Sequence, residues 1–370
     1  MLVRYFNGKG LNVALFVWLL CALIAPKAIT AQKGTLAEDT FHSRALEGNL
    51  SGDSPDRSMY IYLPPSYKKS PTRRYPVIYL LHGYQGSYQQ WTPIVDVLNN
   101  LIAQGAVREM ILVMPDANNK FGGSFYTNSA SIGNWEDFLI KDLIAYVDRK
   151  YRTLPQAASR GIAGHSMGGY GAIKLGMKRP DLYSAVYGLS SCCLGWGGDL
   201  APENAAWKTT LSFKTMDDLK PKDEIYFAQA LMGLSAAWSA NPAGAPFFVD
   251  FLVDSRNNQR KLSESVYAKW SANMPVAMVD QYRTNLALLR AIAFDVGKQD
   301  EFTHIPLTNR ELSQALTRNK IKHSFEEYEG DHNNKVPERL VSKLLPFFSQ
   351  TLEFKAQPST NIVKSKKLRR

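Results

Sequence analysis

The stretch GHSMG, residues 164–168, decides the fold class of this sequence. The short apolar run 161–163 precedes it, as at the end of a buried strand, and a helical pattern follows it. A hydroxyl can stand at the tip of a strand-to-helix turn only if the backbone there is strained and the flanking positions lack side chains. We therefore predict that Ser166 is a nucleophile on such a turn, with the helix beginning at Gly169 or Tyr170 and its N-terminus directed at developing negative charge.

Short apolar runs alternate with longer helical patterns along most of the chain. The run 77–81 is apolar without alternation, as expected for a strand covered on both faces of a parallel sheet. We expect further strands over 57–63, 110–114, 161–163, 185–189, 291–296 and 324–328, and helices over 91–104, 134–151, 307–319 and around 340–348. This order predicts an α/β fold with a mostly parallel, doubly wound sheet, helices on both faces and right-handed crossovers.

Residues 196–281 interrupt this alternation and form an insertion in the core pattern. The segment contains four of the seven tryptophans: Trp196, Trp207, Trp238 and Trp270. It is either a structural subdomain that buries its own aromatic side chains or a cap over a binding site, because insertions at the carboxyl edge of a sheet often determine specificity. Trp196 is our candidate for a substrate contact from this segment.

Composition indicates a large globular protein that does not bind nucleic acid. The chain has 370 residues, of which 45% are hydrophobic and 21% charged, so it can bury a sizeable core. Its net charge is +11, but three unpaired basic residues lie in 1–31 and five in 364–370, which leaves the interior near +3. The basic excess therefore predicts no nucleic-acid groove. We expect a catalytic domain over 32–354 and a basic, disordered tail over 355–370.

The N-terminus has the pattern of a secretory signal peptide, predicted over residues 1–31. Arg4 and Lys9 precede the apolar run 11–25, and small residues follow it. A membrane anchor is the alternative, although the run is shorter than the roughly 20 residues that a spanning helix needs. The sequence thus predicts a secreted or periplasmic protein. Cleavage leaves Cys192 and Cys193, which we interpret as buried small side chains at a strand end rather than a vicinal redox pair.

The loop after the strand 77–81 is a candidate for half of an oxyanion hole. It reads HGYQGS from His82, and its glycines allow close backbone approach. An attacked ester carbonyl becomes an oxyanion, which two converging N–H groups stabilise. We expect the N–H of Met167 to be one donor and that of Tyr84 the other, with Gln85 as the adjacent alternative.

Chain order identifies the candidate base among the six histidines. His332 follows the last expected strand in a polar loop, where this architecture carries the histidine of a Ser-acid-His triad. The acid is expected after the preceding strand, where Asp295, Asp300 and Glu301 lie. Asp300 lies further out on the loop and can reach an imidazole more easily than Asp295, but position alone leaves both open.

With these motifs in order, the chain resembles the esterase D family of α/β-hydrolases from residue 60 to about 348, outside the insertion. The family includes S-formylglutathione hydrolases, feruloyl and acetyl-xylan esterases and mycolyltransferases. Its D-x-G-x-x-D motif implies that Asp300 is the acid, and its His-Gly motif implies Tyr84 as oxyanion donor. Trp91 and His165 belong to the matching motifs, and we expect them, with Gln85 and Trp196, to contact substrate. The S-formylglutathione branch usually carries Ser-Gly-Leu-Thr-Cys at the oxyanion loop, whereas this chain has His-Gly-Tyr-Gln-Gly.

These features predict an exported serine esterase that hydrolyses carboxylic esters, carbohydrate-linked or aryl-acrylate, through an acyl-enzyme. The expected partner is a small or polysaccharide-linked ester. The sequence has no P-loop, dinucleotide fingerprint or zinc motif, so we expect no cofactor and no catalytic metal. The alternatives are acyl transfer to a sugar or lipid alcohol, hydrolysis of S-formylglutathione, and a catalytically silent binding protein with this fold.

Overall fold

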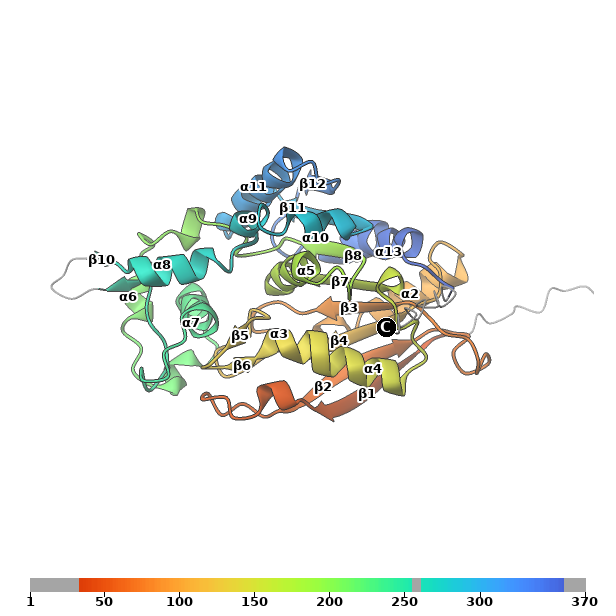
Figure 1. The fold of residues 1–370 in the computed structure, drawn as a ribbon, viewed down its shortest axis with the longest axis horizontal. Coiled ribbons are helices and arrows are strands. Elements are labelled where there is room, and N and C mark those ends of the chain that lie inside the picture. Colours follow the sequence, from red (N-terminus) through yellow and green to blue (C-terminus); the bar gives the residue numbers. More distant parts are fainter. Residues whose placement is uncertain (1–32, 255–260, 356–370) are drawn as a thin grey trace, which may run out of the picture. The chain divides into compact units, whose positions relative to one another are not determined.

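A computed structural model of the chain describes residues 33–254 and 261–355. The predicted signal peptide and basic tail lie outside these residues, apart from Lys355. The central feature is an eight-stranded sheet of order β1-β2-β4-β3-β7-β8-β11-β12 (Figure 1). Its strands are β1 (Thr35–His42), β2 (Asp56–Leu63), β3 (Val77–Leu81), β4 (Ile111–Pro115), β7 (Arg160–His165), β8 (Ala185–Leu189), β11 (Ala291–Gly297) and β12 (Ser324–Tyr328).

The six strands from β4 to β12 run parallel, while β2 pairs antiparallel with both β1 and β4. Helices alternate with the parallel strands along the chain. They are α2 (Ile94–Ala103), α3 (Trp135–Asp137), α4 (Ile144–Lys150), α5 (Met167–Lys178), α11 (His304–Arg318), α12 (Val336–Arg339) and α13 (Leu345–Thr351). The predicted mostly parallel sheet of an α/β protein is therefore confirmed.

Two buried clusters lie on opposite faces of the sheet, and β3 contributes to both. Val77, Tyr79 and Leu81 belong to the cluster that α3, α4, α5 and α11 cover, whereas Ile78 and Leu80 belong to the cluster that α2 and α13 cover. Successive side chains of a strand point to opposite faces, so a strand buried on both sides must be apolar throughout. This explains the uninterrupted apolar run that predicted the strand.

Three local features differ from the sequence prediction. Strand β1 was not predicted; it pairs with β2 at the antiparallel edge of the sheet. Helix α5 begins at Met167, so the predicted start at Gly169 or Tyr170 is wrong, because the turn at Ser166 is tight enough for the next residue to be helical. The helix expected over 134–151 contains a π-helical segment, Phe138–Leu143, between α3 and α4.

The insertion leaves the sheet at the carboxyl end of β8 and returns at β11. It carries α6 (Ala206–Thr210), α7 (Tyr226–Trp238), α8 (Glu264–Ser271), α9 (Pro275–Met278) and the short ladder of β9 (Val253–Asp254) with β10 (Lys261–Leu262). Helix α10 (Arg283–Leu288) lies between the predicted end of the insertion at residue 281 and β11. Figure 1 shows α6, α7 and α8 together at one end of the sheet. Among residues 33–254 and 261–355, no helix has the length and apolar character of a membrane span.

The four tryptophans of the insertion form one aromatic cluster centred on Trp270. The ring of Trp270 lies 5.9 Å from that of Trp196, 5.8 Å from Trp207 and 5.3 Å from Trp238, centroid to centroid. Trp270 and Trp207 are fully buried. The tryptophans therefore pack on one another, and Trp238 joins them to Phe125 and Tyr170 of the main core, which supports the structural interpretation for these side chains.

Candidate active site

Ser166 lies at a sharp turn between β7 and α5. Its backbone has φ +57° and ψ −117°, outside the regions that a side chain ordinarily allows. A Cβ at Gly164 would lie 2.4 Å from the carbonyl of Gly168, and one at Gly168 would lie 2.2 Å from the carbonyl oxygen of Leu81. Only glycine fits at either position, as the sequence analysis predicted. The side chain of Ser166 lines a cleft at the carboxyl edge of the sheet.

Hydrogen bonds to the end of β8 and to the residues after it hold this turn in place. The N–H of Ser166 donates to the carbonyl of Leu189 (2.9 Å), and the N–H of Cys192 donates to the carbonyl of Ser166 (3.2 Å). Met167 is the first residue of α5, where backbone N–H groups have no acceptor within the helix. The amide of Met167 is thus available next to the Ser166 side chain.

The loop after β3 passes beside Ser166. A Cβ at Gly83 would lie 3.6 Å from that of Ser166. Within this loop the N–H of Gly83 donates to Gln90 Oε1 (3.0 Å), and the N–H of Gln85 donates to the carbonyl of Gly122 (2.7 Å). Among the described residues, the Tyr84 N–H has no such acceptor. This geometry favours Tyr84 over Gln85 as the second oxyanion donor.

His332 and Asp300 form a buried hydrogen-bonded pair. Nδ1 of His332 lies 2.7 Å from Oδ2 of Asp300, and the Asp300 side chain is fully buried. The loops that carry them are joined, because Gln299 N–H donates to the carbonyl of Gly330 and Gln299 Oε1 accepts from Gly330 N–H. Nδ1 is oriented by the carboxylate, and within residues 33–254 and 261–355 no hydrogen-bond partner occupies Nε2 of this imidazole, which lines the same cleft as Ser166.

Asp295 has different partners. Its Oδ2 accepts hydrogen bonds from the Tyr187 hydroxyl (2.6 Å) and from Arg339 Nε (2.8 Å). Burial raises the pKa of Asp295, while Tyr187 and Arg339 act against that rise. This carboxylate is thus held by a buried ion pair inside the fold, and the geometry supports Asp300 as the acid beside His332.

His165 contacts His332 directly. Its Nε2–H donates to the carbonyl of His332 (2.9 Å), and the two rings lie 4.6 Å apart. Burial, together with the nearby His332, lowers the pKa of His165 to about 3, so the ring is neutral under ordinary conditions. A neutral His165 supports the backbone of His332 and adds no charge beside it.

The cleft around Ser166 has a volume of about 650 Å³. Its walls include two aromatic residues that the sequence analysis missed, Tyr226 and Phe227 of α7, and also Phe302, whose ring lies 5.1 Å from that of His332. Asp223, Glu224 and Glu301 border the same cleft. The insertion therefore contributes to the cleft through α7 and the turn before it. No periodic pattern marks these residues in the sequence.

A smaller apolar pocket of about 30 Å³ continues from the cleft and is called here the inner pocket. It shares Ser166, Tyr84, Tyr226, Phe227 and Phe302 with the cleft. Its remaining walls come from Phe125 in the loop after β4, from the residues after β8, from α7 and from the start of α11.

Three residues predicted to contact substrate line neither the cleft nor the inner pocket. Trp91 is buried in the cluster under α2, on the far face of the sheet. Trp196 stacks on Tyr267 and Trp270, and its indole N–H donates to Ser271 Oγ. Gln85 donates from Nε2 to Gln229 Oε1. Their side chains thus support the loops and the insertion around the site.

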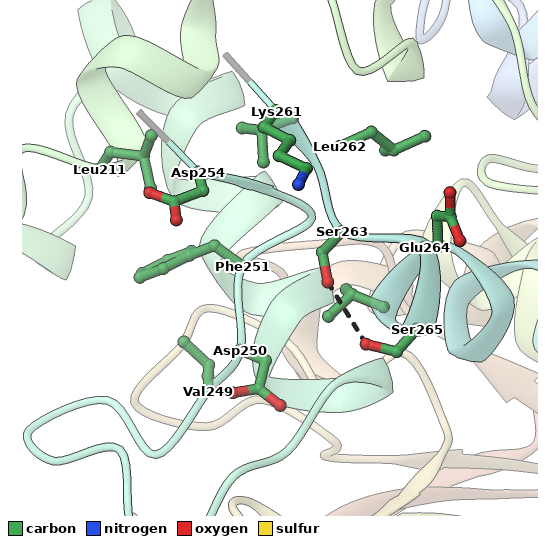
Figure 2. A pocket seen from close by; sticks show the side chains of 12 residues that line it. Leu211, Val249, Asp250, Phe251, Asp254, Lys261, Leu262, Ser263, Glu264 and Ser265 are labelled. Atoms are coloured by element: carbon green, nitrogen blue, oxygen red, sulfur yellow. Dashed lines mark hydrogen bonds between the residues drawn. The ribbon is translucent and has the colours of Figure 1, made fainter. Parts of the chain in front are cut away.

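A larger hollow of about 840 Å³ lies elsewhere in the insertion (Figure 2). Its lining includes Phe251, Asp254, Lys261 and the hydroxyls of Ser263 and Ser265, which lie 3.3 Å apart. None of the predicted site residues lines it. The Ser166 cleft is therefore the candidate active site.

Comparison with known proteins shows the family of the chain. The Esterase family model matches residues 54–336. This chain belongs to the Esterase family. Esterase MT1326 of Mycobacterium tuberculosis is 37% identical over 122 residues, which are 32% of this chain and 25% of that protein. The endo-1,4-beta-xylanase/feruloyl esterase of Xylanibacter ruminicola is 33% identical over 155 residues, which are 39% of this chain and 20% of that protein. The matched part of this chain thus spans a quarter or less of the length of these curated relatives.

Solved structures share the fold. A ferulic acid esterase superposes with a TM-score of 0.61 at 24% identity, covering 86% of this chain and 98% of the other. An S-formylglutathione hydrolase from Agrobacterium tumefaciens superposes with a TM-score of 0.58 at 17% identity, covering 88% and 98%. These structures confirm the predicted α/β-hydrolase fold, and the match to the Esterase family model confirms the resemblance to the esterase D family.

Proposed function

We propose that this member of the Esterase family is a serine hydrolase of carboxylic esters with Ser166, His332 and Asp300 as its triad. One observation carries the proposal: Ser166 stands on a strained turn in the same cleft as His332, whose other ring nitrogen is held by a buried Asp300. A nucleophile, a base and a group that orients the base are the three parts that acyl transfer to water requires.

In the proposed reaction Ser166 Oγ attacks the ester carbonyl carbon and its proton passes to His332 Nε2. The carbonyl oxygen becomes an oxyanion beside the N–H groups of Tyr84 and Met167, which stabilise it. The intermediate collapses to an acyl-enzyme as the alcohol leaves with the proton from His332. Water then attacks the acyl carbon, His332 takes the water's proton and returns it to Ser166, and the acid is released.

The charge at the cleft favours a neutral oxygen ester over a glutathione thioester. Asp223, Glu224 and Glu301 border the cleft, and all three are exposed carboxylates. Glutathione conjugates carry a net negative charge, so these carboxylates disfavour their approach at low salt. The predicted export signal supports the same choice, because an exported enzyme leaves the glutathione of the cytosol. We propose carbohydrate-linked or aryl-acrylate esters as the substrate class of a secreted or periplasmic enzyme.

Hydrolysis rates on acetylated-sugar, aryl-acrylate, short acyl and S-formylglutathione substrates test this proposal. We expect kcat/KM to be highest on an oxygen ester, and we expect covalent labelling of Ser166 by a fluorophosphonate that Ser166→Ala abolishes. The variant Asp223→Asn with Glu224→Gln should raise kcat/KM on the thioester more than on a neutral ester. A kcat/KM tenfold higher on the thioester would refute the substrate class, and absence of both hydrolysis and labelling would refute the enzyme.

Acyl transfer to an alcohol uses the same residues and is the second candidate. The two reactions differ in what attacks the acyl-enzyme, so product analysis with and without added sugar or glycerol separates them. We expect free acid as the main product in both cases. A product dominated by the new ester would favour the transferase.

A further inference from the structure

Two thiols and an imidazole that the proposed mechanism does not use meet in the wall of the inner pocket. One ligand atom each from Cys192, Cys193 and His304 lies within 4.8 Å of the others. All three side chains are buried, and all three line the inner pocket together with Ser166. The two sulfur atoms are 2.7 Å apart.

His304 is oriented toward this cluster by a carboxylate. Its Nδ1 lies 2.5 Å from Oδ1 of Asp199, which also accepts from the His304 backbone N–H (2.9 Å). Nε2 is buried and has no hydrogen-bond partner in the described part of the chain. A histidine that is bonded through one nitrogen to a carboxylate and presents the other is the usual arrangement of an imidazole metal ligand.

We propose that Cys192, Cys193 and His304 form a binding site for a thiophilic divalent cation of the zinc and cadmium type. Two sulfur atoms and one imidazole nitrogen select such cations over magnesium or calcium, which prefer oxygen ligands. Asp199 is the outer carboxylate that holds His304, and the inner pocket supplies the open fourth position.

The geometry accommodates such an ion with small movements. Zinc binds sulfur at about 2.3 Å and imidazole nitrogen at about 2.0 Å in tetrahedral sites, so two bound sulfur atoms stand about 3.8 Å apart. The sulfur atoms of Cys192 and Cys193 must therefore separate by about 1 Å. The inner pocket adjoins the cleft, because the two share Ser166 and Phe302 among their lining residues, so the cleft is the nearest route for an ion.

Both cysteines would bind the cation as thiolates, so binding releases protons to the solvent. A cation held here occupies the space beside Ser166 and should hinder acylation; this consequence rests on the proposed function, whereas binding does not.

Cadmium titration of the full chain carrying Cys21→Ser, whose only thiols are then Cys192 and Cys193, tests the site. We expect one Cd²⁺ per chain, detected by the ultraviolet thiolate-to-cadmium charge-transfer band and by calorimetry. Cys192→Ser and Cys193→Ser should remove the band. His304→Gln and Asp199→Asn should each weaken binding by about tenfold or more. The control His323→Gln, whose ring bonds Ser313 away from the pocket, should bind as the parent does.

Circular dichroism and thermal unfolding of each variant exclude loss of fold as the cause of weaker binding. Absence of the band in reduced protein, with both thiols titrating after denaturation, would overturn the site. Binding that His304→Gln leaves unchanged would overturn the three-ligand assignment. Cd²⁺ should also slow fluorophosphonate labelling of Ser166 in the Cys21→Ser parent and not in the variant that also carries Cys193→Ser. The cadmium band is measured without any ester, so its loss is distinguishable from failure of the proposed esterase activity.

Discussion

Asp295 and Asp300 lie five residues apart in the chain and serve two different partners. Asp300 accepts from the imidazole of His332 in the cleft, and Asp295 is bonded to Arg339 within the fold. Gly297 between them approaches the carbonyl of Gly330 so closely that a Cβ would lie 2.4 Å from that oxygen. The turn around Gly297 thus brings the loop carrying Asp300 against the loop carrying His332, while Asp295 stays in β11.

Replacing each carboxylate by asparagine should therefore affect a different property of the protein, catalysis for Asp300 and stability for Asp295. We expect Asp300→Asn to lower kcat by about 10⁴ with little change in thermal stability, because the imidazole loses the group that orients it. Asp295→Asn removes the buried charge partner of Arg339, which then keeps only the partly exposed Glu326, and should lower the free energy of unfolding by roughly 3 kcal/mol. Kinetics and urea unfolding of both purified variants measure this. A folded Asp295→Asn protein with the larger loss of kcat would reverse the assignment.

Ser166 and His332 should behave as one unit. Ser166→Ala and His332→Ala are each expected to lower kcat by about 10⁴ or more, and the double variant should be little worse than either single variant. Single-turnover kinetics on an activated ester measures all three. Losses that multiply in the double variant would mean that the two side chains act in separate steps.

Motif and chain order predicted the parts of the site that backbone geometry dictates. The glycines around Ser166 follow from local backbone requirements, and His332 follows from chain order, so a single sequence carries both. Position alone left Asp295 and Asp300 open, and only the resemblance to the family implied Asp300. Phe227 was missed because it reaches the cleft through the packing of α7 against the core, a contact between segments far apart in the chain. Trp196 was assigned to substrate because aromatic residues suit both a cap and a core, and only its stacking on Trp270 distinguishes the two.

Aromatic residues of the insertion that line the cleft should respond to substitution differently from those buried in the tryptophan cluster. Phe227 lines the cleft and the inner pocket, so Phe227→Ala should change the ratio of kcat/KM between a bulky and a small ester by about tenfold. Trp270 is fully buried in the tryptophan cluster, so Trp270→Ala should cost about 3 to 5 kcal/mol of stability and leave that ratio unchanged. Phe227→Leu is the matched control, expected to keep stability. A ratio altered by Trp270→Ala and not by Phe227→Ala would contradict this division.

Lys174 on α5 should make stability depend on pH. The side chain is buried, and its Nζ donates to Thr127 Oγ1 (2.7 Å) and to Asn273 Oδ1 (3.0 Å). Burial lowers its pKa from 10.5 to about 7 in the folded chain. Between the folded-state pKa and the unfolded-state pKa, the unfolded chain binds one proton more than the folded chain. Stability therefore rises with pH over this range, and Lys174 destabilises the fold most below its folded-state pKa.

Lys174→Met removes this titration. We expect the variant to gain stability relative to the parent at about pH 6, where the parent buries a charged amine. Most of that advantage should be lost by about pH 10, because the amine is neutral in the folded chain and the free-energy cost of removing its proton becomes small as the pH approaches the unfolded-state pKa. Urea unfolding at several pH values measures the difference. Lys141→Met is the control, since Lys141 is largely exposed and pairs with Asp137 at the surface, and it should shift stability little and without this trend. A difference between Lys174→Met and the parent that stays constant across this range would show that the amine is charged in the folded protein.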